Sequence, residues 1–167
     1  AGLGTQDNPV FRAMYRYALA TSSGTHEGAM MLNQGIARFV FNPFGGFHHA
    51  GKDHAEGFCY INDIAVAIAD LIRKDQRVAY IDIDAHHGNG VQDAFYETDK
   101  VLCISLHESG ETLYPGTGSE AEIGSKEGVG YNVNIPLRAG TDDELYLFVF
   151  QSLVPPLIQN FKPDIVV

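Results

Sequence analysis

The residues best suited to chemistry lie in one short stretch, VAYIDIDAHHGNG at residues 78–90. The stretch begins as an apolar run rich in β-branched and aromatic residues, a pattern that predicts a buried strand. Asp82, Asp84 and His86 fall at two-residue intervals, so an extended chain would turn them in one direction. Such groups are costly to desolvate unless a positive partner, most simply a divalent metal, neutralises them. We therefore expect Asp84 and His86 to bind zinc with Asp82 behind them; the alternative is a solvated strand end with an incidental histidine.

A second candidate is the run GGFHHA at residues 45–50, which places His48 beside His49 in a glycine-rich segment. Two imidazoles in different surroundings suit general acid–base work, because that chemistry needs groups with separated pKa values. Asp82 could orient one imidazole, while the neutral Asn89 would leave the other less basic and better poised near neutral pH. The alternative is that the pair is surface decoration, which is what we expect of His26, His54 and His107.

The helices that must position these residues are marked by spacing and by capping residues. Helical spacing predicts helices at residues 9–20, 25–38, 63–74, about 91–96 and 141 to about 161. The expected N-caps are Thr25, Asn62 and Thr141, the last in a capping box with Glu144. A kink is expected at Pro155-Pro156. Residues 41–60 are predicted to be a long functional loop.

Apolar runs alternate with these helices and predict strands from residue 78, at 100–106 and at 131–137. This alternation implies right-handed crossovers and a mostly parallel sheet covered on both faces, an α/β fold of three αβα layers. Ligands in such sheets lie beyond the carboxyl ends of the strands, where Asp84 and His86 fall. Glycines at 116–118 and 124–130 do not form a phosphate loop, because neither group follows a strand and opens a helix.

Composition narrows the class of protein. The 167 residues are 45% hydrophobic and 19% charged, which fits one ordinary globular domain. A formal net charge of -10 argues against direct binding to nucleic acid. Two cysteines form no disulfide framework, and no apolar run reaches transmembrane length or reads as a signal peptide. We expect a cytoplasmic protein, or a nuclear one if the source is eukaryotic, with no membrane partner.

Both ends of the chain look cut. The first residue is Ala1, without Met, and residues 164–167 resemble the first half of a buried strand. We therefore expect residues 1–167 to be a single, partial domain.

Six motifs are similar, in order and spacing, to those of the histone deacetylase family, which includes acetoin-utilisation proteins and acetylpolyamine amidohydrolases. They are GGFHHA (45–50), GFCYINDIAVAI (57–68), YIDIDAHHGNGVQDAFY (80–96), VLCISLH (101–107), YPGTG (114–118) and NVNIPL (132–137). The resemblance implies the arginase/deacetylase fold, incomplete at both ends. It also implies a zinc-dependent amidohydrolase, with ferrous iron as an alternative metal. Such an enzyme removes acetyl or other acyl groups from lysine side chains or related amines, using a metal-activated water and a histidine pair.

The resemblance also implies roles for single residues. Asp84 and His86 match two of three metal ligands, and His49 matches the general base and acid, with His48 as an electrostatic helper. Asp82 matches the carboxylate behind His48, and Asn89 stands where many members carry an Asp behind the second histidine. The channel walls match Gly57, Phe58 and Tyr114, and a rim carboxylate matches Asp7. Structural K⁺ or Na⁺ sites match two sets, which are Asp82, Asp84, His86, Ser105 and Leu106, and Phe95, Thr98, Val101 and Tyr131.

The departures from the family pattern concern the ends. The third metal ligand and the transition-state tyrosine would follow residue 167, so we expect the 167 residues alone to be inactive. A completing chain or a homo-oligomer is one way to complete the site, and the expected substrate is an acetylated protein, peptide or small amine.

Two other functions fit the sequence less well. An arginase-type binuclear hydrolase needs a carboxylate at the next alternate position, which is Gly88 here. A non-catalytic binding module would not need the five intact site residues, which are His48, His49, Asp82, Asp84 and His86.

Overall fold

The chain divides after Asp75 into two units, Ala1–Asp75 and Gln76–Val167, in a computed structural model that describes all 167 residues. Each unit has its own secondary structure and is described by itself. The expectation of one partial domain stays a prediction.

The first unit is built on two helices, α1 (Met14–Asn33) and α2 (Asp63–Arg73), which pack against each other. The expected separate helices at 9–20 and 25–38 are wrong, because α1 runs without a break through the Ser/Thr/Gly segment between them. The hydroxyls of Thr21 and Ser23 donate to carbonyls one turn earlier, which lets these residues sit inside a helix. Thr25 is therefore an interior residue of α1 and does not cap it.

Helix α2 agrees with its sequence signals. Asn62 is its N-cap, and its side chain accepts a hydrogen bond from the Ala65 amide. The predicted apolar stripe is buried and comprises Ile64, Ala67, Ile68 and Leu71. The segment at 41–60 contains no helix and no strand beyond an isolated bridge between Glu56 and Cys59, so the predicted long loop is confirmed.

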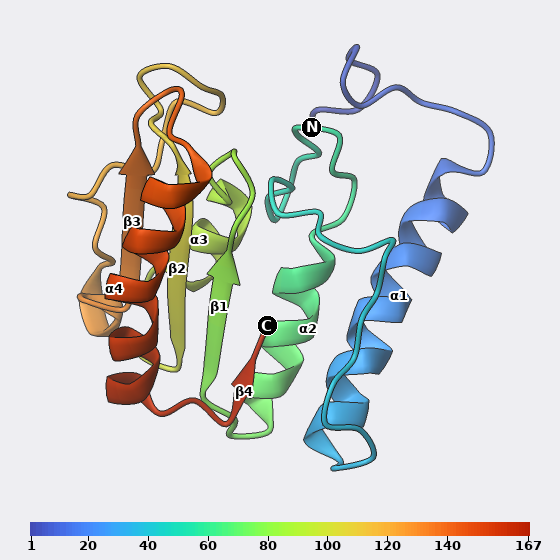
Figure 1. Cartoon of the computed structure of the whole chain (residues 1–167). Coiled ribbons are helices and arrows are strands. Elements are labelled where there is room, and N and C mark those ends of the chain that lie inside the picture. Colours follow the sequence, from blue (N-terminus) through green and yellow to red (C-terminus); the bar gives the residue numbers. More distant parts are fainter. The chain divides into compact units, whose positions relative to one another are not determined.

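The second unit holds a parallel four-stranded sheet in the order β3-β2-β1-β4. Its strands are β1 (Val78–Asp82), β2 (Val101–Glu108), β3 (Asn132–Leu137) and β4 (Ile165–Val166). Helices α3 (Asn89–Phe95) and α4 (Asp143–Phe161) lie on opposite faces of this sheet, and a short 3₁₀ helix, η1 (Lys126–Gly128), precedes β3 (Figure 1). The predicted parallel α/β arrangement is confirmed.

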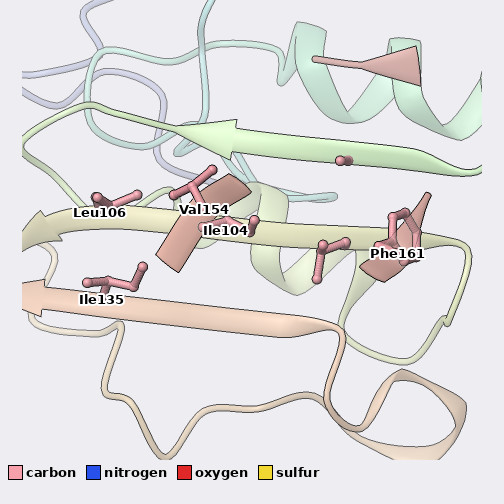
Figure 2. Packing of buried hydrophobic residues seen from close by; sticks show 7 residues of the cluster. Ile104, Leu106, Ile135, Val154 and Phe161 are labelled. Carbon is pink, nitrogen blue, oxygen red and sulfur yellow. The ribbon is translucent and has the colours of Figure 1, made fainter. Parts of the chain in front are cut away.

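The two faces of β2 have different characters. Leu102, Ile104 and Leu106 point to α4 and pack against Val154 and Phe161 of that helix. Figure 2 labels all of these residues except Leu102. The alternate positions include Ser105 and His107, which lie on the face of α3. One face of β2 thus joins an apolar core, and the other face is polar towards the carboxyl end of the strand.

Helix α4 begins one residue later than expected. Asp142 is its N-cap and accepts a hydrogen bond from the Leu145 amide, whereas the Thr141 hydroxyl donates to the Arg138 carbonyl. The expected Thr141–Glu144 capping box is therefore wrong, because a carboxylate one position later fills the cap. The helix continues through its two prolines to Phe161, and the kink expected there stays a prediction. None of the helices combines the length and the apolar character needed to cross a bilayer.

Candidate active site

The histidine pair belongs to the first unit and is buried. His48 is 7% exposed and His49 is 4% exposed, so the pair is not surface decoration. The two ring centroids lie 4.1 Å apart, with the planes tilted by 50°. Two touching, nearly dry imidazoles are a suitable arrangement for moving a proton inside a closed site.

The start of α2 holds the backbone around this pair. Asn62 donates through Nδ2 to the carbonyls of His48 and Ala50, at 3.3 and 3.0 Å. Asp63 accepts from the amides of Gly46 and Phe47. Asn62 was expected only as a helix cap, and Asp63 carried no sequence signal beyond its place in the first turn.

Gly57, an expected channel residue of the first unit, lies against His49. Gly57 has a positive φ of 52°, and a Cβ there would be 2.4 Å from Cδ2 of the His49 ring. The imidazole therefore occupies the room that a side chain at position 57 would need. Phe58 follows with 69% of its surface exposed, and Asp7 is an exposed loop residue. Asn8 donates to the Cys59 carbonyl and so ties the segment of Asp7 to that of Phe58.

In the second unit, β1 ends at Asp82, so the chain is not extended through the three expected site residues. The extended-strand explanation for their shared direction is therefore wrong. Asp82 is buried, accepts from the Tyr80 hydroxyl and from the Asp84 amide, and lies at the strand end. Asp84 and His86 come together through a turn instead, with Asp84 Oδ1 at 2.9 Å from His86 Nδ1.

Asp84 and His86 are more open than the histidine pair. Their side chains are 52% and 42% exposed, and the Tyr114 ring lies edge-on to the His86 ring at 6.4 Å. Tyr114, an expected channel wall, thus lies beside a candidate metal ligand. Asn89 is half-buried at the first turn of α3. In neither unit do three or more His, Cys, Asp or Glu side chains form a group that could hold a metal ion.

The expected monovalent-cation residues all lie in the second unit. Asp82 pairs in register with Ser105, and Leu106 follows Ser105 along β2. The second set comprises Phe95 at the end of α3, Thr98, Val101 at the start of β2 and Tyr131 before β3. The Phe95 carbonyl accepts from the Thr98 amide, and the Tyr131 carbonyl accepts from the Cys103 amide. Whether either set binds a cation stays a prediction.

A polar network that the sequence does not predict lies on the α3 face of the sheet. Gln92 is its hub, because its Oε1 accepts from Asn132 and Asn134 and its Nε2 donates to Glu122. His87 Nε2 also lies 3.1 Å from Gln92 Oε1, and its Nδ1 lies 2.8 Å from the Thr117 hydroxyl. Alternation along β3 is the one signal that could have indicated it, since Asn132 and Asn134 share a face.

The expectation that His107 is a surface residue is wrong, because it is 1% exposed beside His87. Its Nδ1 lies 2.8 Å from the Ser105 hydroxyl and its Nε2 lies 3.0 Å from the Gly118 carbonyl. Burial lowers the pKa of His107, and burial together with the nearby His107 lowers the pKa of His87 to about 4. Both imidazoles are therefore neutral near pH 7.

Neither cysteine is a candidate nucleophile. Both are buried, and burial, with a smaller contribution from Asp82, raises the pKa of the Cys103 thiol to about 12. A thiol with that pKa has almost no reactive thiolate near neutral pH.

The chain is similar to known proteins of one family. A family model described as histone deacetylase domain matches residues 2–167. Histone deacetylase B of Dictyostelium discoideum is 47% identical over 162 residues, which cover 97% of this chain and 38% of that protein. Histone deacetylase RPD3 of Saccharomyces cerevisiae is 47% identical over 161 residues, or 96% of this chain and 37% of that protein.

A solved structure supports the fold. The crystal structure of an HDAC homolog from Aquifex aeolicus matches with a TM-score of 0.92 and 42% identity, covering 98% of this chain and 44% of that one. The chain thus spans less than half the length of these relatives. Because the family model covers nearly all of its residues and the solved homolog shares its fold, the chain belongs to the histone deacetylase family.

Proposed function

We propose that the intact protein is a metal-dependent deacetylase that removes acetyl or related acyl groups from lysine side chains or similar amines. The observation that carries this proposal is the buried His48–His49 pair with ring centroids 4.1 Å apart, in a chain of the histone deacetylase family. A structure of an HDAC homolog complexed with SAHA shows that one relative accepts a small molecule.

The histidine pair would carry the proton. His49 would take a proton from the water that attacks the amide carbonyl and would later deliver it to the departing amine, so one residue serves both steps. His48, in contact with that ring, would stabilise the charge that His49 acquires. Burial supports these roles, because a site without bulk water strengthens the electrostatic interactions inside it.

Asp84 and His86 would hold the metal, with Asp82 supporting them from the end of β1. An oxygen donor and a nitrogen donor already lie side by side at 2.9 Å, a combination that suits Zn²⁺ and also Fe²⁺. Both side chains are about half open, which leaves room for further donors. When bound, the metal would polarise the amide carbonyl and lower the pKa of water.

The substrate chain would lie against aromatic and glycine surfaces. Tyr114 lies beside His86, and Gly57 lies against His49, so each candidate group has a channel residue next to it. The exposed Phe58 ring would pack on the methylenes of an acetylated lysine, and Asp7 would accept hydrogen bonds from substrate backbone.

We also propose a structural K⁺ or Na⁺ beside the catalytic metal. The register pairing of Asp82 with Ser105 supports it, because the pairing brings residues of both strands to one strand end. The second set, Phe95, Thr98, Val101 and Tyr131, would hold another such ion through carbonyls.

The test is to load the intact protein with zinc and to assay acetyl-lysine peptides, acetylpolyamines and small acetylated amides. We expect hydrolysis of at least one class, with loss of activity on chelation and recovery on adding zinc back. Binding of acetyl-lysine peptides without turnover by the zinc-loaded protein would contradict the proposal and would indicate a binding module. Faster turnover of acetylpolyamines than of peptides would identify small amines as the substrate class.

A further inference from the structure

Asp63 is a carboxylate that the proposed chemistry does not use, although it is completely buried. It is the first residue of α2 and has 0% of its surface exposed. A buried carboxylate is costly unless donors surround it. Its Oδ1 accepts from the Phe47 amide at 2.7 Å, and its Oδ2 accepts from the Gly46 amide at 3.1 Å. Its donors thus come from the two residues that immediately precede His48.

A third donor connects Asp63 to α1. The Thr25 hydroxyl donates to Asp63 Oδ2 across 38 positions of sequence. Asn42 donates in turn to the Thr25 hydroxyl at 2.8 Å and to the Thr21 carbonyl at 3.1 Å. The Phe44 amide donates to the oxygen of the same Asn42 side chain. A continuous line of hydrogen bonds therefore runs from α1 through the loop to the start of α2.

Gly45 shows how tightly the loop is drawn onto these groups. A Cβ at this position would be 2.4 Å from the Thr25 hydroxyl oxygen and 2.5 Å from Asp63 Oδ2. Real Cβ atoms do not approach other atoms so closely, so any side chain here would displace the Thr25–Asp63 hydrogen bond. Glycine at position 45 is explained by this contact.

The other side of the histidine pair is held by the neighbouring residue. Asn62 donates to the His48 and Ala50 carbonyls, so the N-cap and the first residue of α2 hold the backbone on both sides of the pair. Both residues are buried, and they lie at the start of a helix whose apolar stripe anchors it in the first unit. The loop thus takes its conformation from α2.

We propose that Asp63 is a positioning residue for the His48–His49 pair, acting through the amides of Gly46 and Phe47 with the support of Thr25. This inference rests on the proposed function, because it treats His48 and His49 as catalytic. Asp63 itself would not contact the substrate. An Asn at this position keeps the shape but places an amide NH₂ against N–H and O–H donors, so one of the three hydrogen bonds is lost and the loop shifts. Displacement of a catalytic group by about 1 Å costs on the order of 10² in rate.

The test compares Asp63→Asn with the wild type in the intact, zinc-loaded protein. We expect kcat to fall by about 10²-fold with KM and bound zinc nearly unchanged, since Asp63 binds neither substrate nor metal. Asp75→Asn, at an exposed carboxylate two residues beyond α2, is the matched control and should leave kcat unchanged. Thr25→Val should lower kcat by a smaller factor, and Thr25→Ser, which restores the hydroxyl, should recover it.

A second readout does not depend on activity. NMR hydrogen exchange in the same variants should show faster exchange at the Gly46 and Phe47 amides and shifted His48 and His49 ring signals, while the amides of the α2 core stay protected. This pattern separates loop positioning from a general loss of stability, which would expose the whole first unit.

The outcomes separate the two proposals. Wild-type kcat in both Asp63→Asn and Thr25→Val, with unchanged protection at Gly46 and Phe47, would overturn the positioning role. If Asp63→Asn unfolds, Thr25→Val decides the matter by the same two readouts. A wild-type protein without any amidohydrolase activity would contradict the proposed function, and the exchange data would still decide whether Asp63 holds the loop.

Discussion

His49 and Asp84 are assigned opposite tasks, one moving a proton and the other holding a metal, and their surroundings agree with that division. His49 is 4% exposed against another imidazole, whereas the Asp84 side chain is 52% exposed beside the His86 nitrogen. A proton carrier benefits from a dry site, while a metal ligand must reach an ion that also binds water and substrate.

The first prediction separates these tasks by mutation. His49→Ala should lower kcat by about 10²–10⁴-fold, the usual contribution of a general base, and should leave bound zinc unchanged. Asp84→Ala should lower both zinc content and activity, because it removes an anionic ligand. Activity and zinc per protein are measured in the same preparations, with His26→Ala as a control remote from both residues in sequence. Equal loss of zinc in His49→Ala and Asp84→Ala would show that His49 is misassigned.

At the scale of elements, Gln92 connects α3 to β3 and to the excursion between β2 and β3. It bonds Asn132, Asn134, Glu122 and His87, and Glu122 also accepts from the amides of Gly118 and Ser119. Because the hydrogen bonds are shared, one side chain holds several segments together. The same excursion carries Tyr114, a candidate channel wall.

The second prediction concerns that hub. Gln92→Leu keeps the volume similar but removes the acceptor shared by Asn132, Asn134 and His87 and the donor to Glu122, although both asparagines keep the Glu122 carbonyl as a second acceptor. An unsatisfied buried polar group costs about 1–3 kcal/mol, so the free energy of unfolding should fall by at least about 2 kcal/mol. Urea denaturation measures it, and the exposed Gln151→Leu of α4 is the control, with an expected change within about 0.5 kcal/mol. Equal stability of the two variants would show that Gln92 is not a hub.

At the scale of the whole molecule, burial of two histidines couples stability to pH. The pKa of His87 is lowered to about 4 and that of His107 is lowered as well, whereas the unfolded chain protonates both near their ordinary value of 6.5. The unfolded state therefore binds more protons than the folded state as the pH falls below 6.5. The neighbouring Asp82 and Glu122 favour the protonated histidines, but burial outweighs them.

The third prediction follows from that sign. Stability contributed by the two histidines is fully present above pH 6.5 and is lost as the pH falls towards about 4. Burial raises the pKa of Glu122, but hydrogen bonds from Gln92 and two amides outweigh burial, and the net effect is a lowered pKa. The stability that Glu122 contributes is therefore also lost in acid. The urea concentration at the unfolding midpoint should therefore decrease as the pH is lowered from 7 to 5. His54→Gln should retain this fall, because nearby Asp53 raises the pKa of that histidine and gives the opposite dependence. A midpoint independent of pH would contradict the prediction.

The fourth prediction compares the 167 residues with the intact protein. These residues provide Asp84 and His86 but no group of three metal-binding side chains, and catalytic zinc sites generally use three. The isolated segment should therefore retain zinc poorly and hydrolyse acetyl-lysine peptides far more slowly than the intact protein. Turnover is normalised to bound zinc in both proteins. Equal turnover per zinc would show that the segment is sufficient by itself.

Local signals determined much of what the sequence correctly indicated. Asn62 caps α2, apolar runs become parallel strands, and Asp84 and His86 meet within three residues of chain, because each feature depends on neighbours in sequence. Where local signals were ambiguous, they failed: Thr25 looked like a helix cap and Thr141 like the start of a capping box. Both residues are of a type that can cap a helix, but their hydroxyls bond elsewhere: Thr25 donates to Asp63, and Thr141 donates to the Arg138 carbonyl.

Only the tertiary structure decided which polar side chains form hydrogen bonds with residues distant in the sequence. Asp63 meets Thr25 from 38 positions away, and Gln92 meets Asn134 from 42 positions away. His107 is likewise buried because a neighbouring strand and the following excursion cover it. A polar side chain can be satisfied by water, by its own backbone or by a distant residue, and residue type and spacing do not distinguish these outcomes. The sequence by itself therefore determined which reactive side chains the protein has. Tertiary packing decided which of them are buried and fixed by hydrogen bonds.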